Sequence, residues 1–186
     1  MTRLLRNIPN LLTAIRIVLA PLTSYLLFQQ QYLAALFVFA FAGASDALDG
    51  FLARRFGLVS RFGEYLDPAA DKLLMLACFI TLTVMQRAPL WLTAIVIGRD
   101  IAIVLGVGIA RLFSLPLKIE PLVVGKASTV VQVGYIGLVL LLLTTGSGMP
   151  VLVEAAGIIA AGFTLMSWFS YGQLLLKAFA LGRRAA

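Results

Sequence analysis

The chain has 186 residues, of which 61% are hydrophobic and only 12% are charged, and its formal net charge is +7. An ordinary soluble domain carries about 25% charged residues, so the composition excludes one. A chain this apolar is expected to lie in a bilayer, where helices and closed barrels satisfy the backbone. Unbroken apolar runs such as LLMLACFITLTVM lack the alternation of a membrane barrel. We therefore predict an all-α, polytopic membrane protein.

Six apolar stretches follow one another along the chain, separated by short polar or proline- and glycine-containing breaks. Each is close to the roughly 20 residues that a transmembrane helix needs. The first follows Arg3 and Arg6, as in a signal peptide, but it is long and lacks a clear small-residue cleavage site, so we interpret it as a retained helix. The whole chain, 1–186, is predicted to form one transmembrane domain with helices at 9–28, 32–53, 66–86, 89–110, 122–144 and 151–176.

The basic residues lie mainly at the ends of these stretches and on one side of the predicted bundle. Arg87 stands alone on the other side. By the positive-inside rule, both termini and the loops at 54–65 and 111–121 are cytoplasmic. This distribution indicates attraction to anionic lipid and not nucleic-acid binding. The short chain without a transit-like extension favours a bacterial inner membrane over a mitochondrial one.

Four aspartates stand close together in the segment SDALDGFLARRFGLVSRFGEYLDPAADK, at positions 45–72. Asp46 and Asp49 are spaced i, i+3 and share one face of the second predicted helix, while Asp67 and Asp71 are spaced i, i+4 on the third. A short loop makes these helices antiparallel neighbours, which brings the carboxylates to a similar depth near the cytoplasmic edge. Unpaired anions there would repel one another and carry a large desolvation cost.

A cation is therefore expected among the aspartates. Oxygen ligands in a chain without histidine favour Mg²⁺, Mn²⁺ or Ca²⁺. Two divalent ions would neutralise the four charges and could also gather a diphosphate. The alternative is ion pairing between helices, through Arg54, Arg55, Arg61 and Lys72, but such pairing does not require this spacing.

Small and basic residues accompany the acidic face. Gly50 lies beside it, where a missing side chain lets a ligand approach the backbone. Arg54, one turn further on, can reach a phosphate bidentately. Gly63 is predicted to lie in the loop, where a simple turn residue is the alternative.

The same segment carries a family resemblance. DALDGFLARRFGLVSRFGEYLDPAAD matches the spacing D-x2-D-G-x2-A-R-x8-G-x3-D-x3-D, so the chain resembles the CDP-alcohol phosphatidyltransferases. The resemblance implies six transmembrane helices, cytoplasmic termini, a homodimer, and transfer of a phosphatidyl group from CDP-diacylglycerol to an alcohol with release of CMP. It also implies Mg²⁺ or Mn²⁺ as cofactor, with two ions.

The resemblance assigns roles by position. Asp46, Asp49 and Asp67 match metal ligands, and Asp71 matches a ligand that also acts as the general base. The positions that match the CDP-binding residues of the family are Gly50, Ala53, Arg54 and Gly63.

The opening NIPNLLTAIRIVLAP is similar to the start of the glycerophospholipid branch, which includes phosphatidylglycerophosphate synthases and cardiolipin synthases. Asn10, Thr13 and Arg16 are candidates to contact the diphosphate. Helix capping is the alternative for Asn10 and Thr13. Arg16 lies well inside the first span, where an idle arginine is costly, so we favour a phosphate-facing role.

The acceptor is expected to be a glycerol-type alcohol. RD at 99–100, KIEP, GKASTVVQ and SYGQ resemble the cardiolipin synthases of the CDP-alcohol type, which implies phosphatidylglycerol as acceptor. Glycerol 3-phosphate, the acceptor of phosphatidylglycerophosphate synthases, is the alternative. A buried ion pair of Arg99 with Asp100, and topology charges at Arg111 and Lys118, are the other interpretations. The candidates for binding an acceptor phosphate are Arg99, Arg111, Lys118 and Lys126.

Two other classes of protein are alternatives to this enzyme. A membrane prenyltransferase also binds a diphosphate through aspartates, but on separated helices of a longer chain without the A-R-x8-G element. A cation transporter tends to show repeats or broken helices near the midplane, whereas these aspartates cluster at one predicted membrane face. The phosphatidyltransferase is the favoured prediction.

Overall fold

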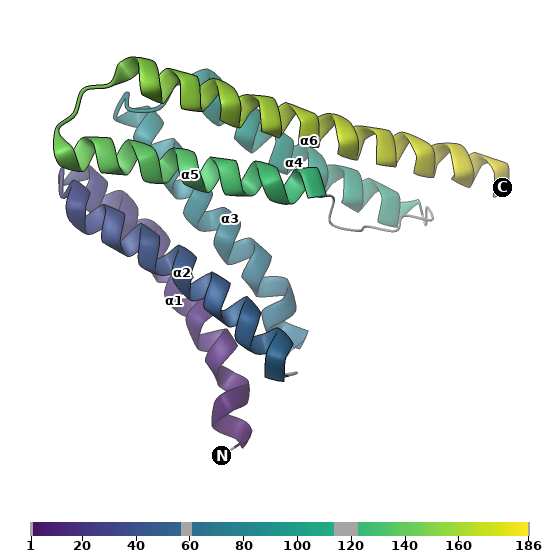
Figure 1. Cartoon of the computed structure of the whole chain (residues 1–186). Helices are drawn as coiled ribbons and strands as arrows, with labels where there is room; N and C mark the ends of the chain where they lie inside the picture. Colours follow the sequence, from purple (N-terminus) through teal and green to yellow (C-terminus); the bar gives the residue numbers. More distant parts are fainter. Residues whose placement is uncertain (1, 57–60, 114–122, 186) are drawn as a thin grey trace. The chain divides into compact units, whose positions relative to one another are not determined.

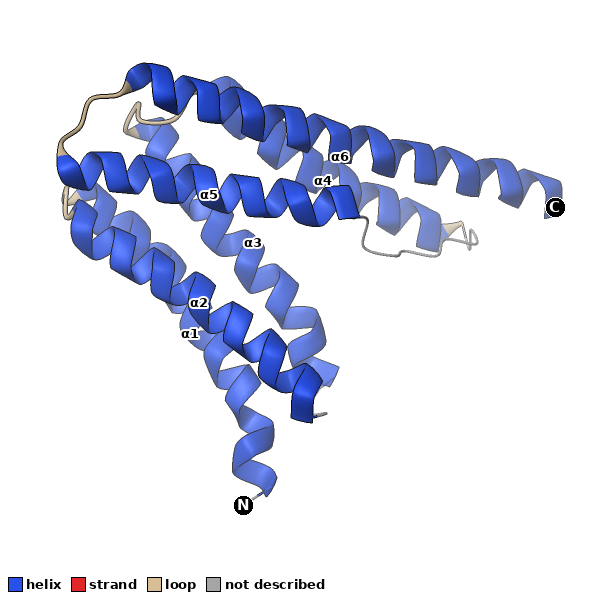
Figure 2. Cartoon of the chain, in the orientation of Figure 1, coloured by secondary structure: helices blue, strands red, loops and turns tan. Residues whose placement is uncertain are grey.

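The computed structural model describes the backbone of residues 2–56, 61–113 and 123–185, and the side chains of residues 15–45, 72–110, 112–113 and 123–179. The described backbone forms α-helices and contains no strand (Figures 1 and 2). The all-α prediction is confirmed. The helices are α1 (Thr2–Phe28), α2 (Tyr32–Phe56), α3 (Arg61–Val84), α4 (Leu90–Leu112), α5 (Val123–Thr145) and α6 (Pro150–Ala185).

Several helix ends differ from the predicted bounds. α1 begins at Thr2 and not at 9, α3 begins at Arg61 and not at 66, and α6 continues to Ala185 and not only to 176. Hydrophobicity marks the apolar part of a helix, but the backbone ladder continues through polar residues as readily. Gly63 therefore lies in the first turn of α3, and its predicted place in a loop is wrong.

Three helices end in the same type of turn. Gln30, Gln86 and Gly146 follow α1, α3 and α5 with φ values of 58°, 58° and 65°. In each turn the next residue donates a backbone hydrogen bond to the carbonyl five positions earlier, at 2.9, 2.7 and 3.1 Å. This is the Schellman arrangement, which favours glycine at the left-handed position. Glycine occupies that position after α5 alone among these three.

The first of two compact units comprises Met1–Arg87 and Ile136–Gly148. Within it, α1 packs against both α2 and α3. Thr81 of α3 donates a 2.9 Å hydrogen bond to Ser24 of α1, and Thr81 is buried. Fully buried side chains beside this contact include Leu27, Phe79, Leu82 and Cys78, the single cysteine of the chain.

The second unit comprises Ala88–Tyr135 and Met149–Ala186, and in it α4 packs against α6. Glycines allow the close approach of these two helices. A Cβ on Gly98 would lie 3.3 Å from the Trp168 ring, and one on Gly106 would overlap Leu175. Small residues at such contacts are typical of helix pairs in membranes.

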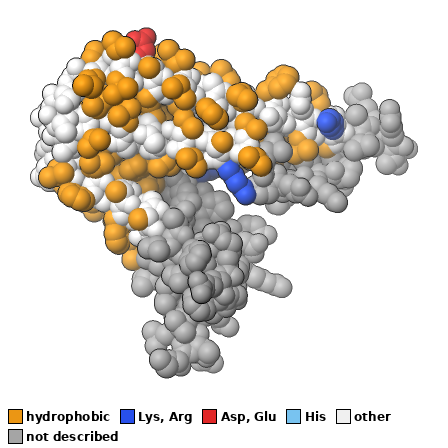
Figure 3. Space-filling model, in the orientation of Figure 1, with side chains coloured by type: hydrophobic (Ala, Val, Ile, Leu, Met, Phe, Trp, Pro, Cys, Tyr) orange, Lys and Arg blue, Asp and Glu red, His pale blue; other side chains and the backbone are white. Residues whose placement is uncertain are grey.

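The surface matches a lipid environment. Leu90–Ala110, Val123–Thr145 and Pro150–Phe179 are each long and apolar enough to cross a membrane. In the first unit the described apolar stretches are shorter, at Ile15–Phe28, Tyr32–Ser45 and Lys72–Val84. Hydrophobic side chains are spread over the described surface on the face shown in Figure 3, where few charged side chains are seen. The chain is a polytopic membrane protein.

Candidate functional site

The predicted metal ligands lie on two helices of the first unit. α2 carries Asp46 and Asp49, and α3 carries Asp67 and Asp71. The backbone is helical at all four positions, as the spacing argument requires. Their side chains lie outside the described residues, so the convergence of the carboxylates remains a prediction. Among the described residues, no cluster of acidic, histidine or cysteine side chains could hold a metal.

The predicted nucleotide-binding residues accompany the aspartates. Gly50, Ala53 and Arg54 lie on α2 within two turns of Asp49, and Gly63 lies at the start of α3. Their side-chain positions lie outside the described part of the chain. The assignment of these residues to CDP therefore remains a prediction.

α1 contributes a buried cation to the same unit. Asn10 and Thr13 lie in the interior of α1, which begins at Thr2, so the alternative interpretation of these two residues as N-caps is wrong. Arg16 is only 1% exposed. An arginine is rarely buried in a membrane protein without a functional reason. Because α1 packs on both α2 and α3, Arg16 is held on the helix that contacts both aspartate-bearing helices.

A second buried arginine, Arg99, lies on α4 in the second unit and is 5% exposed. Its Nη1 donates to Oδ1 of Asp100 at 2.7 Å, and its Nη2 donates to Oγ of Ser167 on α6 at 2.8 Å. The guanidinium also lies over the ring of Tyr171, 5.7 Å from the ring centroid. The alternative prediction, an ion pair of Arg99 with Asp100, is thus present, and Ser167 and Tyr171 of α6 extend it.

α5 comes very close to this guanidinium. A Cβ built on Gly125 would lie 3.3 Å from Nη2 of Arg99 and 3.3 Å from the Tyr171 ring. Gly125 is itself buried, whereas the next residue, Lys126, is exposed. Lys126 is therefore not part of the buried cluster. The side chain of Arg111 and the whole of Lys118 lie outside the described residues.

One hydrogen-bond donor of Arg99, Nε, takes no part in these contacts. Its Nε is buried and has no hydrogen-bond partner among the residues that the structure describes. A buried donor without a partner costs about 1–3 kcal/mol, so such groups are uncommon and call for an explanation.

A second group of buried polar residues lies on α5 and α6, one helical turn away from Gly125 and Ser167. Gln132 of α5 donates from Nε2 to Ser128 at 3.2 Å and to Thr164 of α6 at 2.8 Å. All three residues are buried. Ser128 follows Gly125 by three positions, and Thr164 precedes Ser167 by three, so both groups lie on the same faces of α5 and α6.

The roles of Ser167, Tyr171, Gln132 and Thr164 are not predicted from the sequence. One signal was available: polar residues recur at intervals of three or four within the apolar spans of α5 and α6, which places them on one helix face. Such a face is normally turned away from lipid.

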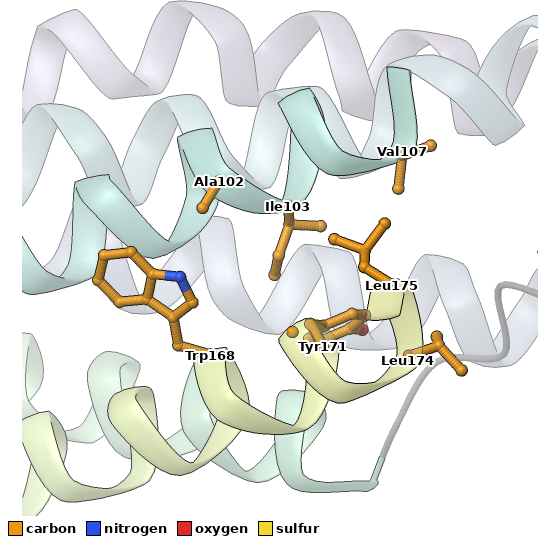
Figure 4. A pocket seen from close by; sticks show the side chains of 8 residues that line it. Ala102, Ile103, Val107, Trp168, Tyr171, Leu174 and Leu175 are labelled. Carbon is orange, nitrogen blue, oxygen red and sulfur yellow. The ribbon is translucent and has the colours of Figure 1, made fainter. Parts of the chain in front are cut away.

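An apolar pocket lies between α4 and α6 of the same unit. Figure 4 shows side chains of α4 facing side chains of α6 across it. Tyr171 belongs both to this pocket and to the contact with Arg99. The pocket is lined by Ala102, Ile103, Val107, Trp168, Tyr171, Gly172, Leu174 and Leu175.

Comparison with known proteins adds independent information. Residues 6–171 match the family described as CDP-alcohol phosphatidyltransferase. A probable cardiolipin synthase (CMP-forming) of Drosophila melanogaster is 40% identical over 149 residues, which cover 71% of this chain and 46% of the relative. A CDP-diacylglycerol–glycerol-3-phosphate 3-phosphatidyltransferase of Pseudomonas fluorescens is 50% identical over 103 residues, or 52% of each chain.

A further relative of the second kind is matched along nearly its whole length. The CDP-diacylglycerol–glycerol-3-phosphate 3-phosphatidyltransferase of Aquifex aeolicus is 31% identical over 170 residues, which cover 89% of this chain and 93% of the relative. By contrast, the match spans about half the length of the Drosophila and Pseudomonas relatives.

Proposed function

The chain belongs to the CDP-alcohol phosphatidyltransferase family, and from this membership we propose that it transfers a phosphatidyl group from CDP-diacylglycerol to an alcohol and releases CMP. The observation that carries the proposal is the family match over residues 6–171, which includes the whole aspartate signature. The helical backbone at all four aspartates supports the proposal, because spacings of three and four place side chains on one face only in a helix.

The donor set suits a divalent cation. Four carboxylates in a chain without histidine fit Mg²⁺ or Mn²⁺ by ligand chemistry. Asp46, Asp49, Asp67 and Asp71 would hold the cation, with two ions as the expected number. When bound, the metal supplies positive charge that polarises the diphosphate and stabilises the leaving CMP.

The remaining chemistry falls to the chain's own groups. Asp71 takes the proton of the acceptor hydroxyl as its oxygen forms a bond to the phosphorus of the phosphatidyl group. The bond from that phosphorus to the bridging oxygen breaks at the same centre, and CMP leaves with the electron pair. Proton, electrons and phosphate are thereby accounted for without a further reactant.

Donor binding is assigned to the neighbouring positions. Gly50, Ala53, Arg54 and Gly63 are the proposed contacts of the CDP moiety. Asn10, Thr13 and Arg16 of α1 are the proposed contacts of the diphosphate. The burial of Arg16 on a helix that packs against both α2 and α3 supports this assignment.

Phosphatidylglycerol is the proposed acceptor, which makes cardiolipin the product. Arg99 is the proposed contact of the acceptor phosphate, supported by its burial and by the hydrogen bond from its Nη2 to Ser167. Lys126 is a weaker candidate because it is exposed, and Arg111 and Lys118 remain candidates from sequence.

Glycerol 3-phosphate is the second candidate acceptor. It is favoured by the relative from Aquifex aeolicus, which is named for that acceptor and is matched over 93% of its length. Both acceptors carry a phosphate, so a basic residue alone does not separate them.

The setting of the reaction follows from the predicted topology. We propose a bacterial inner membrane as its location, with the active site facing the cytoplasm, where the positive-inside rule predicts the basic loops to lie. Assembly as a homodimer, which the family resemblance implies, remains a prediction.

One experiment tests the function and separates the acceptors. Purified protein in mixed micelles receives CDP-diacylglycerol with either phosphatidylglycerol or glycerol 3-phosphate, and CMP and the lipid product are identified by mass spectrometry. Cardiolipin should form with phosphatidylglycerol; phosphatidylglycerophosphate alone would establish the second candidate. EDTA should stop the reaction and Mg²⁺ or Mn²⁺ should restore it. Absence of CMP with both acceptors would refute the proposal.

A further inference from the structure

We propose that Ser167, Tyr171 and Gly125 are positioning residues that hold the guanidinium of Arg99 in one orientation toward the anionic group of the acceptor. The inference rests on the proposed function, in which Arg99 contacts that group. It adds two helices to the acceptor site, because Ser167 and Tyr171 come from α6 and Gly125 from α5.

Three side chains constrain the plane of the Arg99 guanidinium. Hydrogen bonds from Nη1 to Asp100 and from Nη2 to Ser167 fix the two outer nitrogens at 2.7 and 2.8 Å. The Tyr171 ring lies beneath the same group at 5.7 Å, within the range of a cation–π contact. A long arginine side chain in a membrane normally extends toward the interface. This one is instead held in the interior by groups on two helices.

α5 approaches Arg99 and Tyr171 closely at Gly125. Gly125 leaves room for Nη2 of Arg99 and for the Tyr171 ring, each of which would lie 3.3 Å from a Cβ at this position. Such a contact is tighter than most, so with an alanine here the guanidinium or the ring would have to move by a few tenths of an ångström. The glycine therefore leaves the space in which Arg99 and Tyr171 lie.

A hydrogen bond between α5 and α6 lies one helical turn from Ser167. Thr164, one turn earlier on α6, accepts a 2.8 Å hydrogen bond from Gln132 of α5. This contact fixes the register of α6 against α5 next to the guanidinium. The side chain that holds Arg99 is thus itself held, which is the arrangement that binding groups need for precise orientation.

Arg99 makes more contacts than an ion pair with Asp100 requires. Asp100 is adjacent to Arg99 on α4 and would pair with it without any help from α6. With the additional contacts to Ser167 and Tyr171 in place, Nε is still buried and has no partner among the described residues. A purely structural cluster would be expected to satisfy that donor. An orientation selected for a ligand accounts for the exception.

The test compares acceptor and donor kinetics in matched variants. Ser167→Ala should raise the acceptor KM about tenfold, the loss expected for a hydrogen bond to a charged group. Gly125→Ala should also raise it, because the added Cβ would meet the guanidinium and the Tyr171 ring. The KM for CDP-diacylglycerol and the kcat should change far less. Ser167→Thr keeps the hydroxyl and should restore the acceptor KM. Gly134→Ala, on the same helix with no atom near its Cβ, should match wild type.

Tyr171 supplies a second pair of variants. Tyr171→Phe keeps the ring beneath the guanidinium and should retain the acceptor KM, whereas Tyr171→Leu should raise it. These variants also decide the matter if Ser167→Ala does not fold. Wild-type turnover with an unchanged acceptor KM in Gly125→Ala and Tyr171→Leu would overturn the inference while the proposed function stood. A wild type that releases no CMP would overturn both.

Discussion

Nη2 of Arg99 on α4 donates a 2.8 Å hydrogen bond to Oγ of Ser167 on α6, 68 positions further along the chain. A lysine would retain the charge but would lose the fork that reaches Asp100 and Ser167 together. We expect Arg99→Lys to raise the acceptor KM by about tenfold or more. Arg87→Lys, at an exposed position, is the control. Equal acceptor KM values in the two variants would contradict the role of Arg99.

Replacement of the proposed base tests the chemistry separately from binding. Asp71→Asn preserves shape but removes the group that accepts the proton, so CMP release should fall by at least about 100-fold. Because Asp71 is also a proposed metal ligand, binding of CDP-diacylglycerol is measured by titration calorimetry at a saturating Mg²⁺ concentration, where the other three aspartates should largely retain it. Turnover at the wild-type rate would show that another group accepts the proton.

Gly106 tests the packing of α4 against α6. A Cβ at this position meets the flexible end of Leu175, so Gly106→Ala should be tolerated after Leu175 rotates. Gly106→Leu should overpack the contact and destabilise the protein by about 1–3 kcal/mol. Gly108→Leu is the control, because a Cβ there has open space. Thermal unfolding in detergent should give a lower Tm for Gly106→Leu than for Gly108→Leu, and the reverse order would be inconsistent with this packing.

The hydrogen bond between Thr81 and Ser24 tests the packing of α1 against α3. A double-mutant cycle with Thr81→Val and Ser24→Ala should give a coupling free energy of about 0.6 kcal/mol, the average for such contacts in membranes. The measurement is the free energy of unfolding of the four proteins in one detergent. Additive effects of the two substitutions would show that the 2.9 Å contact contributes nothing.

Gln30 tests the cost of a left-handed residue. Its φ of 58° disfavours a residue with a Cβ, so Gln30→Gly should stabilise the folded chain by up to about 1 kcal/mol. Gln29→Gly, in the same turn but without a positive φ, should give no gain. The comparison is again made by unfolding free energies. A loss of stability in Gln30→Gly would refute the assignment of strain.

Much of the fold could be predicted from hydrophobicity alone. A bilayer forces long apolar runs into helices, so composition and the breaks between runs were enough to predict all six. The ends were less predictable. Arg3 and Arg6 lie inside α1 although they are charged, because the backbone ladder does not stop where hydrophobicity does. The same effect places Gly63 inside α3.

The candidate site also has one part that the sequence predicts and one part that it does not. The aspartate signature is local, and spacing on a helix is enough to indicate it. The residues around Arg99 are distant in sequence, since Ser167 and Tyr171 meet it only when α4 packs on α6. No spacing rule joins positions so far apart. Sequence could therefore identify Arg99 as an unusual charge but not the groups that hold it.

The burial of Cys78, the single thiol of the chain, has a practical consequence. A membrane-impermeant maleimide added to intact cells should leave the native protein unlabelled, so a cysteine placed in any loop would report alone. Cysteines at Gln31 and Gly148, both exposed, would show which ends of the helices face the outside. The side of the membrane on which these helix ends lie can thus be read from labelling without removing a native residue.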